Sequence, residues 1–245
     1  MEKTNRIFCI GDIHGAAKAL EQVLDKVDFD YENDILIQLG DVADGWSEIP
    51  QCVETLLKCK NLIAIRGNHD DWFIQWYKTR IKNPMWLRQG GQATYDSYTS
   101  MKWIDKLDEH YEKFWSKQHF KYLDSEGNLF VHGGINRHIE LEHNSNTIFM
   151  WDRDMFQSAL SFKASNRGNK GTFNLSDKRI KRIFIGHTST VMWNTDKPIN
   201  VNDQIINLDT GAGWNGKLTI MNVDTLEYWQ SDNVKELYPD EAGRR

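Results

Sequence analysis

The chain has 245 residues, of which 40% are hydrophobic and 27% charged, and its formal net charge is −5. This composition is typical of a folded globular protein and excludes a disordered chain. The negative charge offers no general attraction to nucleic acids or anionic membranes, so we expect neither a membrane nor a stable nucleic-acid partner.

The beginning of the chain and the cysteines indicate the cellular compartment. No run of about 18 apolar residues is present, and the first apolar stretch ends at Asp12, too early for a signal peptide. Cys9, Cys52 and Cys59 are odd in number and form no C-x-x-C pair, which argues against disulfides or a thiolate zinc site. We therefore expect a cytoplasmic protein.

Short apolar runs alternate with helical patterns from the start of the chain. Strands are expected at residues 6–10, 34–39, 61–65, 128–132, 182–186 and 204–209. Residues 16–27 and 49–59 carry apolar side chains at helical spacing, and Pro50 lies near the start of the second segment. This alternation predicts an α/β protein built from β-α-β units on a mainly parallel sheet.

The remaining segments complete the predicted organisation. Residues from about 70 to 119 are rich in helix formers and Trp, which predicts a helical insertion, and residues 216–230 predict a β-hairpin. We expect one domain over residues 1–240 and a frayed tail over 241–245.

Polar side chains follow five of the expected strands. The loops read GDIHG, GDVADG, RGNHDD, VHGG and IGHT, and each contains glycine. Ligands bind at the carboxyl ends of strands in open α/β sheets, so these loops should meet in one crevice. The candidate ligands in them are Asp12, His14, Asp41, Asn68, His132 and His187.

This donor set predicts a metal centre. Oxygen and imidazole donors without a thiolate suit Mn, Fe or Zn, and six side chains are too many for one catalytic ion that keeps open positions. A carboxylate can bridge two ions and a water between them becomes hydroxide, which predicts metal-assisted hydrolysis. A lone Asp after a strand usually caps a turn, so the interpretation depends on the five loops together.

The ordered motifs GDIHG, GDVADG, RGNHD, VHGGI and IGHT resemble the signature of the calcineurin-like metallophosphoesterases. Within them, the chain is most similar to the prokaryotic and phage branch of the phosphoprotein phosphatases, that of the bacteriophage lambda phosphatase. The resemblance implies a four-layer α-β-β-α sandwich of two mixed sheets flanked by helices. It also implies two divalent metal ions, Mn or Fe with Mn, with Zn or Ni also accepted.

The same resemblance implies roles for individual residues. One ion would be held by Asp12, His14 and Asp41, and the other by Asp41, Asn68, His132 and His187, with Asp41 bridging. His69 would be the general acid, oriented by Asp44, whose carboxylate should raise the pKa of the imidazole. Arg153 would bind the phosphoryl oxygens with its planar fork.

The chain departs from the family at one position. The phosphoprotein phosphatases usually carry a phosphate-binding arginine where this chain has Gly45. Arg137, Arg88 and Arg167 are candidate replacements, with Arg137 placed in the substrate site. The neighbouring Trp46 could stack on a nucleobase at the rim of the site or pack against the helical insertion.

These observations predict a phosphoesterase that hydrolyses phosphomonoesters by direct attack of a metal-bridging hydroxide. The first interpretation is a serine/threonine-type protein phosphatase acting on phosphoproteins. The alternative is a nucleotide or polynucleotide-end phosphatase, or a dinucleoside polyphosphate hydrolase, and the absent arginine weakens the first interpretation. A third is a non-catalytic scaffold, which the intact ligand set and His69 disfavour.

Overall fold

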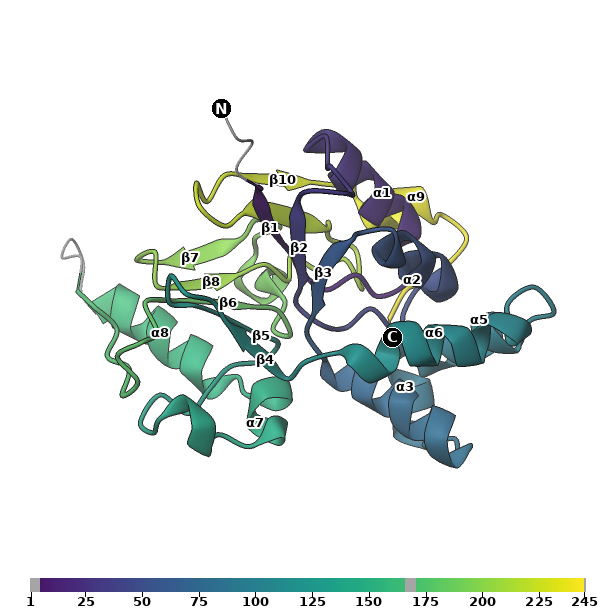
Figure 1. Ribbon diagram of the computed structural model, residues 1–245, viewed down its shortest axis with the longest axis horizontal. Coiled ribbons are helices and arrows are strands. Elements are labelled where there is room, and N and C mark those ends of the chain that lie inside the picture. The colour runs from purple at the N-terminus through teal and green to yellow at the C-terminus, as the bar shows by residue number, and fades with distance from the viewer. Residues whose placement is uncertain (1–4, 166–170, 245) are drawn as a thin grey trace.

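The structure, a computed structural model, describes residues 5–165 and 171–244 and is built around two five-stranded sheets (Figure 1). The first sheet has the order β10-β9-β1-β2-β3 and the second the order β4-β5-β6-β8-β7. The strands are β1 (Ile7–Ile10), β2 (Ile35–Gln38), β3 (Asn61–Ala64), β4 (Lys121–Leu123), β5 (Asn128–Val131), β6 (Arg182–Ile185), β7 (Ile199–Val201), β8 (Ile205–Asn207), β9 (Thr219–Asn222) and β10 (Tyr228–Gln230).

Both sheets are mixed, with three parallel strands each. Strands β1, β2 and β3 run parallel, and the antiparallel β9 and β10 extend the sheet beyond β1. In the second sheet β5, β6 and β8 run parallel, while β4 and β7 pair antiparallel at its two edges. The predicted hairpin at 216–230 is the β9-β10 pair.

Alternating side chains of the strands fill separate cores. In β1, Phe8 and Ile10 pack beneath the helices of the first sheet, whereas Cys9 points into the space between the sheets. Phe130 of β5 and Phe184 of β6 stack there with ring centroids 4.9 Å apart. Because side chains alternate along a strand, each sheet can be apolar on both faces, as a four-layer sandwich requires.

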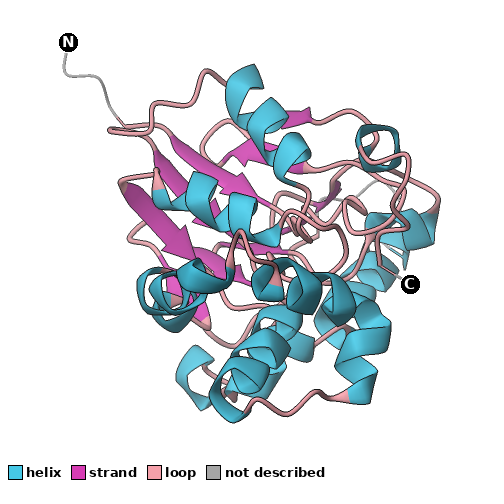
Figure 2. Ribbon diagram, turned by 90° about the vertical axis from the view of Figure 1, so that its right-hand side faces the viewer, coloured by secondary structure: helices cyan, strands magenta, loops and turns pink. Residues whose placement is uncertain are grey.

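Helices cover the outer faces of the two sheets, and further helices lie in the segment between β3 and β4 (Figure 2). Helix α1 buries Leu20, Val23 and Leu24, and each such side chain contributes about 1.5–3 kcal/mol. The helices are α1 (Ala17–Lys26), α2 (Ile49–Leu57), α3 (Asn68–Thr79), α4 (Pro84–Trp86), α5 (Gln92–Thr99), α6 (Leu107–Lys113), α7 (Asn146–Trp151), α8 (Asp154–Ser165) and α9 (Val234–Leu237). The structure is the predicted pair of mixed sheets flanked by helices.

The Trp-rich segment between β3 and β4 is helical, and its aromatic side chains form a core. Phe73 and Trp76 of α3 contact Trp86, Tyr98 and Trp115, and all are buried. Among the described residues, no helix is long and apolar enough to cross a membrane.

The prediction of a frayed tail is wrong for residues 241–244. The carboxylate of Glu241 accepts hydrogen bonds from the backbone and hydroxyl of Ser47, at 2.9 and 2.7 Å. The backbone of Arg244 donates to the carbonyl of Gly213 at 2.8 Å. The charged, glycine-containing sequence suggested disorder, but these long-range contacts fix the segment against the loop that follows β2.

Candidate active site

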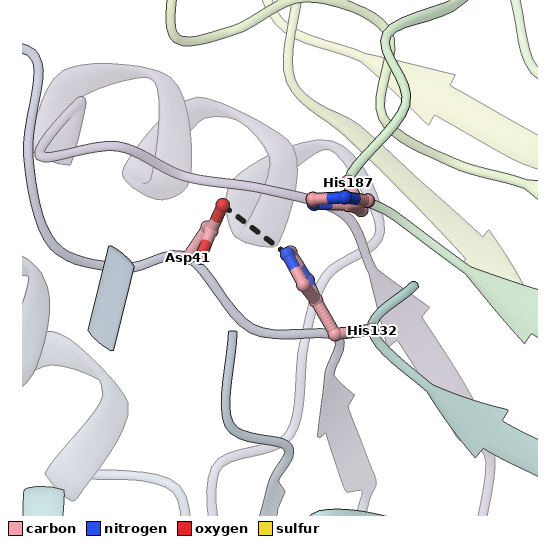
Figure 3. A group of neighbouring side chains, drawn as sticks. All are labelled: Asp41, His132 and His187. Carbon is pink, nitrogen blue, oxygen red and sulfur yellow. Dashed lines mark ion pairs between the residues drawn. The ribbon is translucent and has the colours of Figure 1, made fainter. Parts of the chain in front are cut away.

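The carboxyl ends of β1, β2, β5 and β6, with the start of α3, bring the expected metal ligands together. Asp12, His14 and Asp41 form one group and Asp41, His132 and His187 form a second, with the candidate ligand atoms of each group within 4.8 Å of one another. Figure 3 shows the second group, in which Nε2 of His132 lies 3.2 Å from Oδ2 of Asp41. Asp41 belongs to both groups, since its Oδ2 lies 3.7 Å from Nε2 of His14 and 3.2 Å from Nε2 of His132, so it would be the ligand that two ions share.

The imidazoles present their Nε2 atoms to this centre. Nδ1 of His14 donates to the carbonyl of Ala43 at 2.9 Å, and Nδ1 of His132 donates to that of Leu39 at 2.7 Å. These bonds fix the protons on Nδ1 and leave the Nε2 lone pairs for a ligand. Nε2 of His187 is buried and has no hydrogen-bond partner within the described residues. The donor set therefore fits divalent ions.

Asn68 joins the second group from the first turn of α3. Its Oδ1 lies 3.1 Å from Nε2 of His132, so the amide oxygen points to the same place. Gly67, which precedes it, is required here because a Cβ atom would collide with Oδ1 of Asp41. His14, Asp41 and His187 also adopt positive φ angles of 51°, 57° and 66°. Such strain is held only where the surroundings enforce it, and it is characteristic of functional sites.

Asp70 is a positioning residue that the sequence analysis missed. Its carboxylate accepts hydrogen bonds from the backbone N–H groups of Asp41, Val42, Ala43 and Gly67, at 2.9 to 3.1 Å. Burial, followed by the nearby Asp41, raises the pKa of Asp70 to about 6. The only sequence signal was its place in the RGNHDD loop, and three of its four backbone partners come from the loop after another strand, β2.

Burial and neighbouring charges shift the pKa values of the candidate ligands in different directions. Although burial opposes it, the charges of His132 and His69 hold the pKa of Asp41 well below its usual value. Burial lowers the pKa of His132, but Asp41 and Asp12 outweigh it and raise that pKa to about 9. Burial, then the neighbouring Asp209, raises the pKa of Asp12 well above the ordinary value. The metal-free centre therefore retains protons that bound cations would displace.

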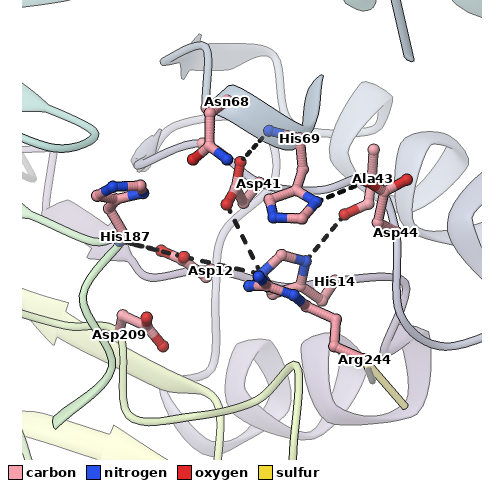
Figure 4. A network of polar contacts seen from close by, with 12 residues as sticks. Asp12, His14, Asp41, Ala43, Asp44, Asn68, His69, His187, Asp209 and Arg244 are labelled. Carbon is pink, nitrogen blue, oxygen red and sulfur yellow. Dashed lines mark hydrogen bonds and ion pairs between the residues drawn. The ribbon is translucent and has the colours of Figure 1, made fainter. Parts of the chain in front are cut away.

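His69 and Asp44 form a buried pair beside the ligands (Figure 4). Nδ1 of His69 lies 2.6 Å from Oδ2 of Asp44. Trp86 donates its indole N–H to both oxygens of Asp44, at 2.9 and 3.0 Å, and the hydroxyl of Thr94 donates at 2.7 Å. The helical segment thus fixes Asp44, and Asp44 fixes the ring of His69.

The expected rise in the imidazole pKa is wrong for the metal-free protein. Burial lowers the pKa of His69 to about 3, against the attraction of Asp41. Burial raises the pKa of Asp44 to about 8, despite the hydrogen bonds from Thr94 and Trp86. Between these values the pair as a whole holds one proton.

A cavity of about 450 Å³ opens beside the metal ligands. It is lined by Arg153, His187, Asp209 and Arg244, and by the apolar side chains of Trp214, Val191 and Met192. Nη1 of Arg153 lies 3.3 Å from the carbonyl of His187 and from Oγ1 of Thr188. The predicted Arg153 is therefore next to the centre, whereas Asp209 and Arg244 are additions from distant parts of the chain.

Two predicted substrate contacts are wrong. Trp46 is fully buried, donates its indole N–H to the carbonyl of Ala212 at 2.7 Å and stacks on Tyr238, so it cannot receive a base. Arg137 lines a separate cavity and covers the ring of Phe173.

The other two candidate replacements for the absent arginine do not supply it either. Arg88 is exposed and does not line the cavity beside the ligands. Arg167 lies outside the described residues.

The family, the relatives and the solved structure to which the chain is similar are all named as phosphoesterases or phosphatases. Residues 5–190 match the family described as calcineurin-like phosphoesterase. The chain is 26% identical to a symmetrical bis(5'-nucleosyl)-tetraphosphatase of Pseudomonas putida, over 92% of each chain. It is 31% identical to serine/threonine-protein phosphatase 1 of Salmonella typhimurium, over 35% of this chain and 38% of that protein. A crystal structure provisionally identified as a diadenosine tetraphosphatase shares the fold, with a TM-score of 0.66, 14% identity and 94% of each chain covered.

Proposed function

The chain belongs to the calcineurin-like phosphoesterase family, and we propose that it is a metal-dependent hydrolase of dinucleoside polyphosphates. The observation that carries the proposal is the composition of the cavity beside the ligands. Arg153 and Arg244 outnumber the one carboxylate among its described lining residues, Asp209, and Trp214, Met192 and Val191 give it an exposed apolar rim, since these residues are 41%, 68% and 44% exposed. A nucleotide offers both a polyphosphate and a flat base, and bases stack on aromatic side chains.

The ligand set supports two divalent ions that share Asp41. Asp12, His14 and Asp41 would hold one, and Asp41, Asn68, His132 and His187 the other. When bound, such ions polarise the phosphoryl oxygens and make a water molecule acidic enough to attack. Manganese is the first choice, with iron, zinc and nickel also compatible with these donors.

The side chains around the ligands have separable roles in the proposed hydrolysis of a phosphoric anhydride. Arg153 holds the phosphoryl oxygens through its guanidinium, which fits them bidentately. His69 supplies a proton to the leaving oxygen as its bond to phosphorus breaks, and Asp44 keeps the imidazole in position. The cavity keeps the base away from the reacting phosphorus.

A substitution at the rim tests the substrate class. Trp214→Ala should raise KM for diadenosine tetraphosphate about tenfold, because a stacked base contributes about 1–3 kcal/mol. Hydrolysis of a phosphoserine peptide, which has no base, should be unchanged. The control is Tyr228→Ala, which removes a similarly exposed aromatic from the distant β10. Equal losses on both substrates would contradict the proposal.

A serine/threonine protein phosphatase is the second candidate. Its support is the 31% identity to serine/threonine-protein phosphatase 1, which extends over 35% of this chain. Two Pseudomonas relatives named as tetraphosphatases align over 96% and 92% of the chain, which favours the nucleotide substrate.

A further inference from the structure

The last described residue of the chain reaches the active site. One guanidinium nitrogen of Arg244, Nη1, lies 3.1 Å from Nε2 of His14, and Figure 4 shows the side chain entering from the C-terminal segment. The guanidinium also lies over the ring of Trp214, 5.0 Å from its centroid. This arginine therefore lies between the metal ligands and the apolar rim.

The side chain passes through the space that Gly45 leaves free. A Cβ atom at Gly45 would lie 3.3 Å from Cγ of Arg244, and one at Gly90 would lie 3.1 Å from the same atom. Gly45 also has a φ of 102°, which a residue with a side chain rarely adopts. An arginine side chain at position 45 would therefore press against the stem of Arg244 from its first atom.

The segment that carries Arg244 is fixed at several points. Glu241 accepts two hydrogen bonds from Ser47, which lies two residues after Gly45. The backbone N–H of Arg244 donates a hydrogen bond to the carbonyl of Gly213. Gly243 packs directly against Trp46, and a Cβ atom there would come within 2.8 Å of the indole ring. The C-terminal segment therefore packs on Trp46 and helps to bury it.

Among the described residues that line the cavity, the two arginines outnumber one carboxylate, that of Asp209, so the balance of charge favours an anion. Arg153 and Arg244 both line it, and neither forms an ion pair with a carboxylate within residues 5–165 and 171–244. Nε of Arg244 is buried without a hydrogen-bond partner in the same residues. A divalent ion at His14 would repel the guanidinium from that imidazole toward any anion in the cavity.

We propose that Arg244 is the second phosphate-binding arginine of the site, supplied by the C-terminal segment in the space left by Gly45. Arg153, from the middle of the sequence, and Arg244 would together bind the phosphate chain of the substrate. The inference rests on the proposed function, since it assumes that a phosphate group occupies the cavity.

Direct binding of inorganic phosphate tests the inference. Calorimetric titration into Mn²⁺-loaded protein should show 10- to 100-fold weaker binding for Arg244→Gln, the range expected when charge-assisted hydrogen bonds are lost. Arg244→Lys should retain part of the affinity, because the charge remains while the fork is lost. Arg88→Gln, an exposed arginine outside the cavity, is the matched control. Metal content and Tm, measured for each variant, should match the wild type.

Steady-state kinetics give the second readout. Arg244→Gln should raise KM for diadenosine tetraphosphate with a smaller change in kcat. Unchanged phosphate affinity and KM would overturn the inference, and so would higher activity with tighter metal binding, which would make the segment an inhibitor. If the wild type does not cleave diadenosine tetraphosphate, the proposed substrate fails, while the phosphate titration still decides the role of Arg244.

Discussion

Nδ1 of His69 lies 2.6 Å from Oδ2 of Asp44, and the helical segment holds that carboxylate through Trp86 and Thr94. The pair links two strand-end loops to a segment that supplies no metal ligand. The residues proposed for proton transfer are therefore different from the candidate metal ligands. Substitutions can test proton transfer and metal binding independently.

His69→Asn should lower kcat by about 10²–10⁴ on an alkyl phosphate, because the leaving alkoxide then departs without a proton. The loss should be smaller on para-nitrophenyl phosphate, whose leaving group needs less help. Bound metal, measured by mass spectrometry of the purified protein, should equal that of the wild type. Equal losses on both substrates would contradict a role for His69 as the acid.

Asp41→Asn should remove metal as well as activity, because Asp41 belongs to both ligand groups. The bound metal per chain should fall by roughly half or more, since an amide is a weaker ligand than a carboxylate. Asp34→Asn is the control, since Asp34 is also buried but pairs with Arg6 instead. Retention of full metal content by Asp41→Asn would be incompatible with a shared carboxylate.

Trp86→Phe should lower kcat about tenfold without altering metal content. The change removes the indole N–H that both oxygens of Asp44 accept, and a typical hydrogen bond contributes about 0.5–1.5 kcal/mol. Trp115→Phe removes an indole donor that serves Tyr98 instead, and should leave kcat unchanged. The pH profile of kcat should shift for Trp86→Phe alone. Equal losses of kcat in Trp86→Phe and Trp115→Phe would contradict the prediction and attribute the effect to core packing.

Metal-stripped protein should lose stability as the pH rises from 7 to 9. The folded-state pKa values of Asp44 and His132 are raised, to about 8 and about 9, so these groups stabilise the fold below their unfolded pKa values. That contribution is lost as the pH passes through the folded values. His14, His69 and His187 have lowered pKa values and are neutral in the folded state, and at pH 7 only a minority of them carry a proton in the unfolded state, so they offset little of this loss. Tm measured in chelator at pH 7 and pH 9 checks the sign, and a higher Tm at pH 9 would contradict it.

The predictable part of the molecule is the part encoded by local patterns. The strands β1, β2 and β3 are short apolar runs between helices, and the loops that follow them contain the ligands. Their convergence follows from parallel pairing, which a β-α-β pattern predicts. The edge strands β4 and β7 were missed because each has three residues and takes its pairing from a neighbour.

The supporting residues of the site depend on contacts that a linear reading does not reveal. Asp209 lies near Asp12 because β8 and β1 belong to facing sheets, and Trp86 reaches Asp44 across 42 residues. Trp46 was misplaced because a loop aromatic gives no sign of whether a later segment will cover it. The sequence did reveal that position 45 carries glycine in place of an arginine. The segment that covers Trp46, residues 241–244, places Arg244 beside this glycine.

The most direct test of the central claim is the ratio of kcat/KM for diadenosine tetraphosphate to that for a phosphoserine peptide, measured on one Mn²⁺-loaded preparation with a chelated control. A dinucleoside polyphosphate hydrolase with this cavity should favour the dinucleotide at least roughly tenfold and lose activity on both substrates when metal is removed. Preference for the phosphopeptide, or hydrolysis that survives chelation, would contradict the account.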